Sequence, residues 1–146
     1  MTSPDQNNFC VILLSNASRE IYDLNTHADL TVKLVQRIDL GSTSMWEVGV
    51  CENSNPLSPE RENPVLLYCN LISSQFLGDS TVRGIRTFRL YPNLVCQHEF
   101  QNVQNVPLEQ RRFQYIGMEF LRTEGRHIPF QDSTMPPNVL LHFRKN

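Results

Sequence analysis

Apolar and polar side chains alternate along much of this chain, and this period of two limits the fold more than any other feature. Between Asp29 and Leu40 the apolar side chains recur at even positions: Leu30, Val32, Leu34, Ile38 and Leu40. Successive side chains of a β-strand point to opposite faces, so the pattern is typical of a strand with one face in a core. Trp46–Val50 repeats the alternation, and Gly41-Ser42 separates the two runs. The two runs together predict a β-hairpin.

Six further segments have strand character: Phe9–Ser15, Pro64–Ile72, Thr81–Leu90, Val95–Val103, Arg112–Arg122 and Asn138–Arg144. The region from Pro107 to Gly125 also fits a helical face, but a short turn at Leu108–Arg111 followed by a strand is favoured. Eight short strands with turn signals between them predict an all-β protein, a single jelly-roll β-sandwich of about eight antiparallel strands. An immunoglobulin-like sandwich is the nearest rival, but its Cys…Trp…Cys order is poorly matched because Trp46 precedes Cys51 by only five residues.

The length and composition favour one globular domain. The chain has 146 residues, of which 40% are hydrophobic and 19% charged, enough for a core without crosslinks. We expect a flexible N-terminal arm at residues 1–8 and the jelly-roll domain at residues 9–146. The apolar run Phe9–Leu14 is too short, and lacks the basic flank, for a signal peptide or membrane span. We therefore expect production inside the host cell, without a secretory signal.

The cysteines are far apart and form no Cys-x-x-Cys pair. They are predicted to be buried free thiols, with zinc binding or disulfides as the minor alternative: Cys10, Cys51, Cys69 and Cys96. Each lies within an apolar segment, which is the basis of that prediction.

The net charge of −2 indicates no specific nucleic-acid binding. Residues 1–73 have four basic and nine acidic side chains (−5), whereas residues 74–146 have nine basic and six acidic side chains (+3). If the two halves interleave in one fold, this difference mainly means internal pairing. If they form opposite sides, it suits self-association.

The triplet Gly78-Asp79-Ser80 raises the question of a serine nucleophile, because one large group of serine hydrolases presents its nucleophile in this way. A nucleophile needs a base and oxyanion donors, and neither His127 nor His142 follows an Asp by three residues. A turn is favoured instead, in which Gly78 permits a positive φ and Asp79 hydrogen-bonds the local backbone. No catalytic residue is predicted, and we expect the protein not to be an enzyme.

Metal binding is also not expected. A cupin-like site inside a jelly roll would need a His-x-His pair on one strand face, a nearby Glu and a further His. The nearest local approximation is Cys96-Gln97-His98-Glu99, which contains a single Cys-x-His pair. The sequence therefore predicts no metal and no cofactor.

Three arginines share the predicted strand Thr81–Leu90. Spacing of three places Arg83 and Arg89 on one face and Arg86 on the other, next to apolar side chains. An unpaired buried charge is costly, so Arg86 needs a carboxylate partner, and Asp79 is the candidate.

Four segments taken together resemble the minor capsid, or penton, proteins of Polinton/Maverick elements and the related adintoviruses: Trp46–Glu52, Tyr68–Phe88, Asn102–Phe130 and Val139–Arg144. The resemblance covers residues 9–144, and its most distinctive part is the succession "VPL", "RF", a Gly turn, "IPF" and a final "LHFR". It implies a structural virion protein with a single jelly roll. Such a protein forms homopentamers at the fivefold vertices of an icosahedral capsid built from double jelly-roll major capsid proteins.

The family pattern assigns a turn and an arginine-containing strand to Gly78, Asp79 and Arg86. This sequence departs from the pattern at Asn70, where an acidic residue is common, and at Gly84, which weakens the second strand.

Contacts between subunits would then involve Arg83 and Arg89, which lie on one face of the predicted strand. The alternative function is a secreted-type binding module, lectin-like or cytokine-like. The lack of a visible signal and of a disulfide framework disfavours it.

Overall fold

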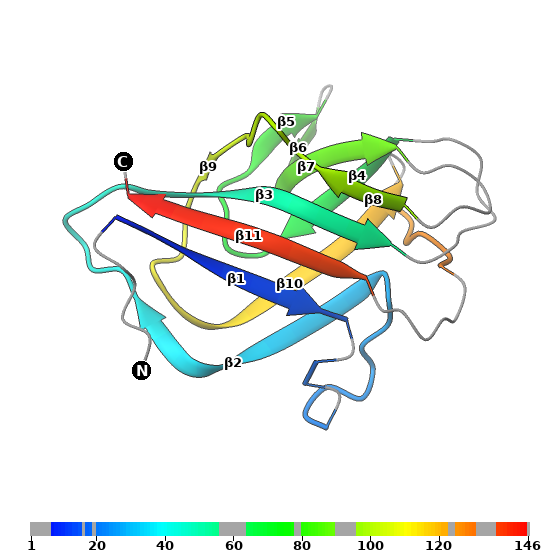
Figure 1. The fold of residues 1–146 in the computed structure, drawn as a ribbon, viewed down its shortest axis with the longest axis horizontal. Helices are drawn as coiled ribbons and strands as arrows, with labels where there is room; N and C mark the ends of the chain where they lie inside the picture. Colours follow the sequence, from blue (N-terminus) through cyan, green and yellow to red (C-terminus); the bar gives the residue numbers. More distant parts are fainter. Residues whose placement is uncertain are drawn as a thin grey trace.

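The computed structural model describes residues 7–15, 17–18, 20–55, 64–77, 80–89, 96–122, 125–130 and 137–145. These residues contain eleven β-strands joined by loops (Figure 1). The strands are β1 (Asn8–Leu14), β2 (Asp29–Asp39), β3 (Trp46–Asn55), β4 (Pro64–Cys69), β5 (Gln75–Leu77), β6 (Ser80–Val82), β7 (Gly84–Arg89), β8 (Cys96–Glu99), β9 (Val106–Pro107), β10 (Arg112–Arg122) and β11 (Asn138–Lys145). In these described segments, no helix has the length and apolarity needed to cross a membrane.

The long strands form two antiparallel sheets in jelly-roll order. Sheet A has the order β1-β11-β3-β8, with β9 also paired to β3, and sheet B has the order β2-β10-β4-β7. When these eight strands are numbered along the chain, the orders become 1-8-3-6 and 2-7-4-5, so all but one connection passes between the sheets. This interleaving defines the jelly roll and confirms the predicted fold class.

The predicted hairpin between β2 and β3 is wrong. Strand β2 pairs with β10, whereas β3 pairs with β11, β8 and β9, so the two lie in different sheets. Gly41 has a φ of 75° and lies at the corner where the chain leaves sheet B. A positive φ favours glycine in a hairpin and in a corner alike, so the Gly-Ser signal does not decide between them.

The core lies between the sheets and is formed by alternate residues of the long strands, as the sequence predicts. Val48 and Val50 of β3, Phe120 of β10 and Phe143 of β11 are all fully buried. The ring of Phe143 stacks on that of Phe9, with centroids 4.7 Å apart. Burial of these apolar side chains is the main stabilising contribution to the sandwich.

The region around β7 differs from the single predicted strand Thr81–Leu90, because the described chain pairs in two parts on either side of Arg83. Strand β6 pairs with β5, and β7 pairs with β4. A Cβ at Gly84 would lie 2.5 Å from Cδ1 of Leu66, so glycine allows β7 to approach β4 closely. Strand β8, Cys96–Glu99, is likewise shorter than the predicted Val95–Val103.

The strand after the predicted turn is confirmed as β10, which occupies the interior of sheet B between β2 and β4. Its length and its two partners make it the best-paired strand of that sheet.

The prediction of buried thiols is wrong for two cysteines. Cys10 is exposed and Cys51 is half-buried, whereas Cys69 is buried. Cys10 occupies an outward position of β1, between inward residues of the alternation. Burial raises the pKa of the Cys69 thiol to about 12. The side chain of Cys96 lies outside the described residues.

The first and last described residues lie side by side. Asn8 of β1 is opposite Arg144 of β11, and the backbone N–H of Lys145 donates to the carbonyl oxygen of Asn7 at 2.7 Å. Each sheet also contains strands from both halves of the chain. The charge difference between the two halves therefore does not become two charged sides of the molecule.

Candidate functional site

Arg86 lies on the same face of sheet B as the buried Leu67, its partner across β4 and β7. Its Nη1 donates a hydrogen bond to the carbonyl oxygen of Asn102 at 2.7 Å. The guanidinium carbon lies 4.0 Å from the centroid of the Phe100 ring. Burial lowers the pKa of Arg86. Among the described residues, a carbonyl oxygen and an aromatic face thus stabilise the positive charge of the Arg86 guanidinium.

Gly78 and Asp79, the other members of the predicted motif, lie outside the described residues. The proposed contact between Asp79 and Arg86 therefore stays a prediction.

An aromatic row continues from Arg86 across the gap between the edge strands β7 and β8. The His98 ring stacks on Phe100 with centroids 5.9 Å apart, and lies 5.0 Å from the Phe88 ring. His98 Nε2 is 3.2 Å from the carbonyl oxygen of Arg89. Burial lowers the pKa of His98, which favours the neutral ring. These side chains fill the side of the sandwich between β7 and β8. The contacts of His98 are therefore explained by packing within the fold.

The two arginines expected at an interface lie at opposite ends of β7. Nη2 of Arg83 is 3.3 Å from Oε2 of Glu109, so this guanidinium has an ion pair within its own chain. Arg89 ends β7 opposite Pro64 and is exposed.

A histidine and two carboxylates meet on the outer face of sheet B. Asp29 of β2 and Glu119 of β10 are directly opposite each other, an arrangement of like charges that destabilises a sheet. His127 Nε2 lies 2.8 Å from Oε1 of Glu119 and 3.8 Å from Oδ2 of Asp29. The segment that carries His127 is fixed by a hydrogen bond from Ile128 N–H to the carbonyl oxygen of Phe120. The imidazole therefore lies against both carboxylates, and its shorter contact is a hydrogen bond to the Glu119 carboxylate.

The ligand atoms of Asp29, Glu119 and His127 all lie within 4.8 Å of one another. One imidazole and two carboxylates can bind a divalent cation, but the short hydrogen bond from His127 explains the cluster without one. The absence of a bound metal stays a prediction.

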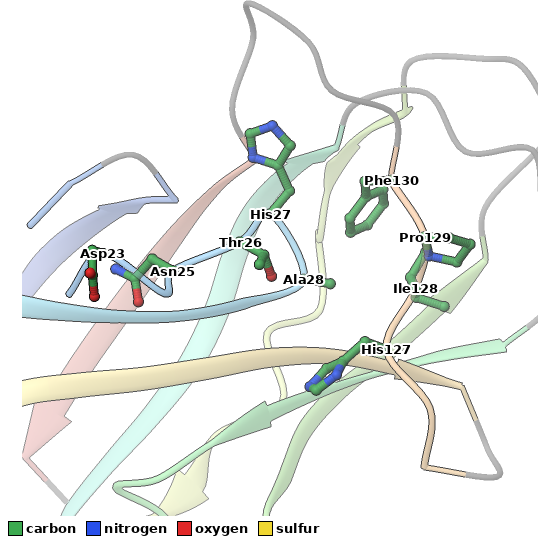
Figure 2. Close-up of a pocket in the computed structure, with 9 residues that line it drawn as sticks. All are labelled: Asp23, Asn25, Thr26, His27, Ala28, His127, Ile128, Pro129 and Phe130. Carbon is green, nitrogen blue, oxygen red and sulfur yellow. The ribbon is translucent and has the colours of Figure 1, made fainter. Parts of the chain in front are cut away.

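An open depression of about 750 Å³ adjoins this cluster (Figure 2). Two segments line it: Asp23, Asn25, Thr26, His27 and Ala28 before and at the start of β2, and His127, Ile128, Pro129 and Phe130 after β10. Nδ1 of His27 is hydrogen-bonded to Oγ of Ser15 at 2.8 Å. Asp29, Glu119 and their register were not singled out from the sequence, because only the strand pairing brings them together.

The outer faces of the two sheets carry apolar side chains that are unusually exposed. Ile12 on sheet A is 67% exposed, and Val35 and Tyr115 on sheet B are 97% and 46% exposed. Outward positions of a sandwich facing water are usually polar, and exposed apolar side chains indicate a contact surface where they gather in one patch.

The interleaved strand order of the two sheets defines a single jelly-roll protein, with apolar side chains exposed on both outer faces. No protein-family model and no curated protein sequence matches the chain. Among solved structures, the chain has the fold of the mavirus penton protein, whose selenomethionine-labelled form was crystallised. That match has a TM-score of 0.64 and 6% sequence identity, and it covers 95% of this chain and 100% of the penton chain.

The departure from the family pattern at Asn70 has a structural explanation. Oδ1 of Asn70 accepts a hydrogen bond from the Gly117 N–H at 2.8 Å, and the Asn70 N–H donates to the Gly117 carbonyl oxygen at 3.1 Å. The side chain and backbone of Asn70 thus extend the pairing of β4 with β10. An Asp at this position could accept the same N–H, so the two residue types are compatible with one contact.

Proposed function

We propose that this chain is a penton, or minor capsid, subunit that forms homopentamers at the fivefold vertices of an icosahedral capsid. The observation that carries the proposal is the likeness in fold to the mavirus penton protein over nearly the whole of both chains. The sequence resemblance to penton proteins of Polinton/Maverick elements supports it independently. In this proposal the protein belongs to the virion and has a structural rather than a catalytic role.

A subunit of a closed ring uses two different surfaces, one toward each neighbour, and the contact closes by rotation. A jelly roll suits this role because its two sheets cover each other and leave the outer faces and loops for neighbouring chains. Further partners in the proposal are the surrounding double jelly-roll major capsid proteins.

The direct test is the mass and shape of the purified protein. We expect native mass spectrometry to give a pentamer and negative-stain microscopy to show fivefold rings. A trimer that binds sugars on a glycan array would instead indicate a lectin-like or cytokine-like module. Ester hydrolysis that is lost in Ser80→Ala would contradict the structural role.

Arg83 and Arg89 remain candidates for contacts between subunits. We expect the double variant Arg83→Glu, Arg89→Glu to weaken the pentamer. Because Arg83 also pairs with Glu109, the single variant Glu109→Gln is the matched control for loss of that ion pair. An unchanged oligomer in the double variant would remove these two residues from the interface.

A further inference from the structure

One row of side chains crosses the outer face of sheet A from edge to edge. Ile12 of β1 is opposite Leu140 of β11, which is opposite Glu52 of β3, which is opposite Glu99 of β8. Directly opposed residues point to the same face and lie about 5 Å apart. These four residues form what we call the acidic row, with two apolar side chains at one end and two carboxylates at the other.

The two carboxylates of the acidic row have no counter-ion within the described part of the chain. Glu52 and Glu99 are both exposed, and neither makes a hydrogen bond or ion pair to another described residue. Like charges directly opposite each other in a sheet are destabilising. The isolated chain thus keeps an unfavourable contact that a cation from another molecule would relieve.

A patch of opposite charge lies on the outer face of sheet B. Lys33, Val35 and Arg37 are alternate outward residues of β2, and Tyr115 of β10 is opposite Lys33. Nζ of Lys33 lies 5.9 Å from the centroid of the Tyr115 ring. We call Lys33, Val35, Arg37 and Tyr115 the basic patch. It combines two cations with two exposed apolar side chains, as the acidic row combines two anions with two apolar side chains.

We infer that the acidic row of one subunit docks on the basic patch of a second copy of this chain, an inference that rests on the proposed function. The two surfaces belong to different sheets, whose inner faces enclose the core. Each subunit can therefore present the acidic row to one neighbour and the basic patch to the other. A contact between unlike surfaces repeats around a ring, and its closure yields a cyclic oligomer. Opposite charges fix the register and orientation, while the apolar side chains supply buried area.

Charge reversal on each surface tests this contact. One variant carries Glu52→Lys and Glu99→Lys, another carries Lys33→Glu and Arg37→Glu, and a third carries all four substitutions. We expect each double variant to raise the protein concentration needed for half-assembly by about tenfold or more, because like charges would then face each other. The fourfold variant has the same net charge as the wild type, and we expect it to assemble again because every contact regains opposite charges.

Sedimentation velocity and native mass spectrometry at low and high salt measure the assembly, and thermal unfolding shows that each variant is folded. If folded double variants assemble like the wild type, the contact lies elsewhere, while the penton proposal is unaffected. If both double variants and the fourfold variant fail to assemble, the residues do not act as a complementary pair and the inference is overturned. A wild-type protein that stays monomeric overturns both the inference and the proposed function.

Discussion

A pair of directly opposed carboxylates lies on the outer face of each sheet, but among the described residues only the pair on sheet B has a side-chain partner within the chain. On sheet B, Asp29 and Glu119 face each other and the imidazole of His127 lies against both. On sheet A, Glu52 and Glu99 face each other and no described side chain supplies a counter-ion. Cross-strand carboxylate pairs are costly, so the pair on sheet B is relieved by a side chain of its own chain, whereas the pair on sheet A keeps its repulsion in the isolated chain.

The largest expected difference in stability between the two outer faces comes from substitution of one glycine on each. A Cβ at Gly49 of sheet A would lie 2.4 Å from Cγ1 of Val103 and 2.9 Å from the carbonyl oxygen of Gln104, whereas a Cβ at Gly117 of sheet B would approach no closer than 3.6 Å to Asn70. We expect Gly49→Ala to lower the free energy of unfolding by about 1–3 kcal/mol, because the covering segment must shift.

Gly117→Ala is the matched control, since its new methyl group meets only ordinary contacts and a strand glycine costs conformational entropy. We expect its stability to equal or exceed that of the wild type in urea denaturation. Equal losses of stability in the two variants would show that the close packing of Val103 and Gln104 over Gly49 is not what distinguishes the two faces.

Removal of the imidazole should make sheet B resemble sheet A. We expect His127→Ala to lower the free energy of unfolding by about 0.5–1.5 kcal/mol, because the Glu119 carboxylate loses its hydrogen bond and the carboxylate pair is left alone. In this background Asp29→Asn should recover part of the loss, whereas alone it should not stabilise the chain. A double-mutant cycle from chemical denaturation measures the coupling, and additive changes would contradict it.

The smallest effect is expected on sheet A. Glu99→Gln removes one of two opposed charges, so we expect it to stabilise the monomer by about 0.2–1 kcal/mol while weakening assembly. Urea unfolding of dilute, monomeric protein measures the first effect, and sedimentation of concentrated protein measures the second. A less stable monomer would mean that Glu99 serves the fold of its own chain.

The sequence predicted those features that depend on neighbours along the chain. The alternation assigns Leu30 and Val32 to the core, and both are buried. It does not reveal which strand pairs with which, and for that reason the hairpin between β2 and β3 was wrong. Strand β2 pairs with β10, which is distant in the sequence. This pairing depends on burying the inner faces of both sheets together, to which every strand contributes.

The candidate site was harder to predict for the same physical reason. Arg86 was expected to need a carboxylate partner because it lies on an apolar face. The contacts seen among the described residues are instead the Phe100 ring and a carbonyl oxygen. The opposed carboxylates, by contrast, depend on register. A slip of one residue would turn Glu52 or Glu99 to the other face, so their proximity is visible only once the pairing is known. Charge counted over halves of the sequence was equally uninformative, because both halves contribute strands to both sheets.

The adjacency of the two ends of the described chain has a practical consequence. Because Asn8 is paired with Arg144, a short linker could join the ends and new termini could be opened in a surface loop, giving a circular permutant with the same sheets. A fluorescent label at Asn8 or at Arg144 would occupy nearly the same point of the molecule. Opening the chain at successive loops would then move a single reporter around the sandwich, and the loops at which rings still form would map the surfaces that neighbouring subunits leave free.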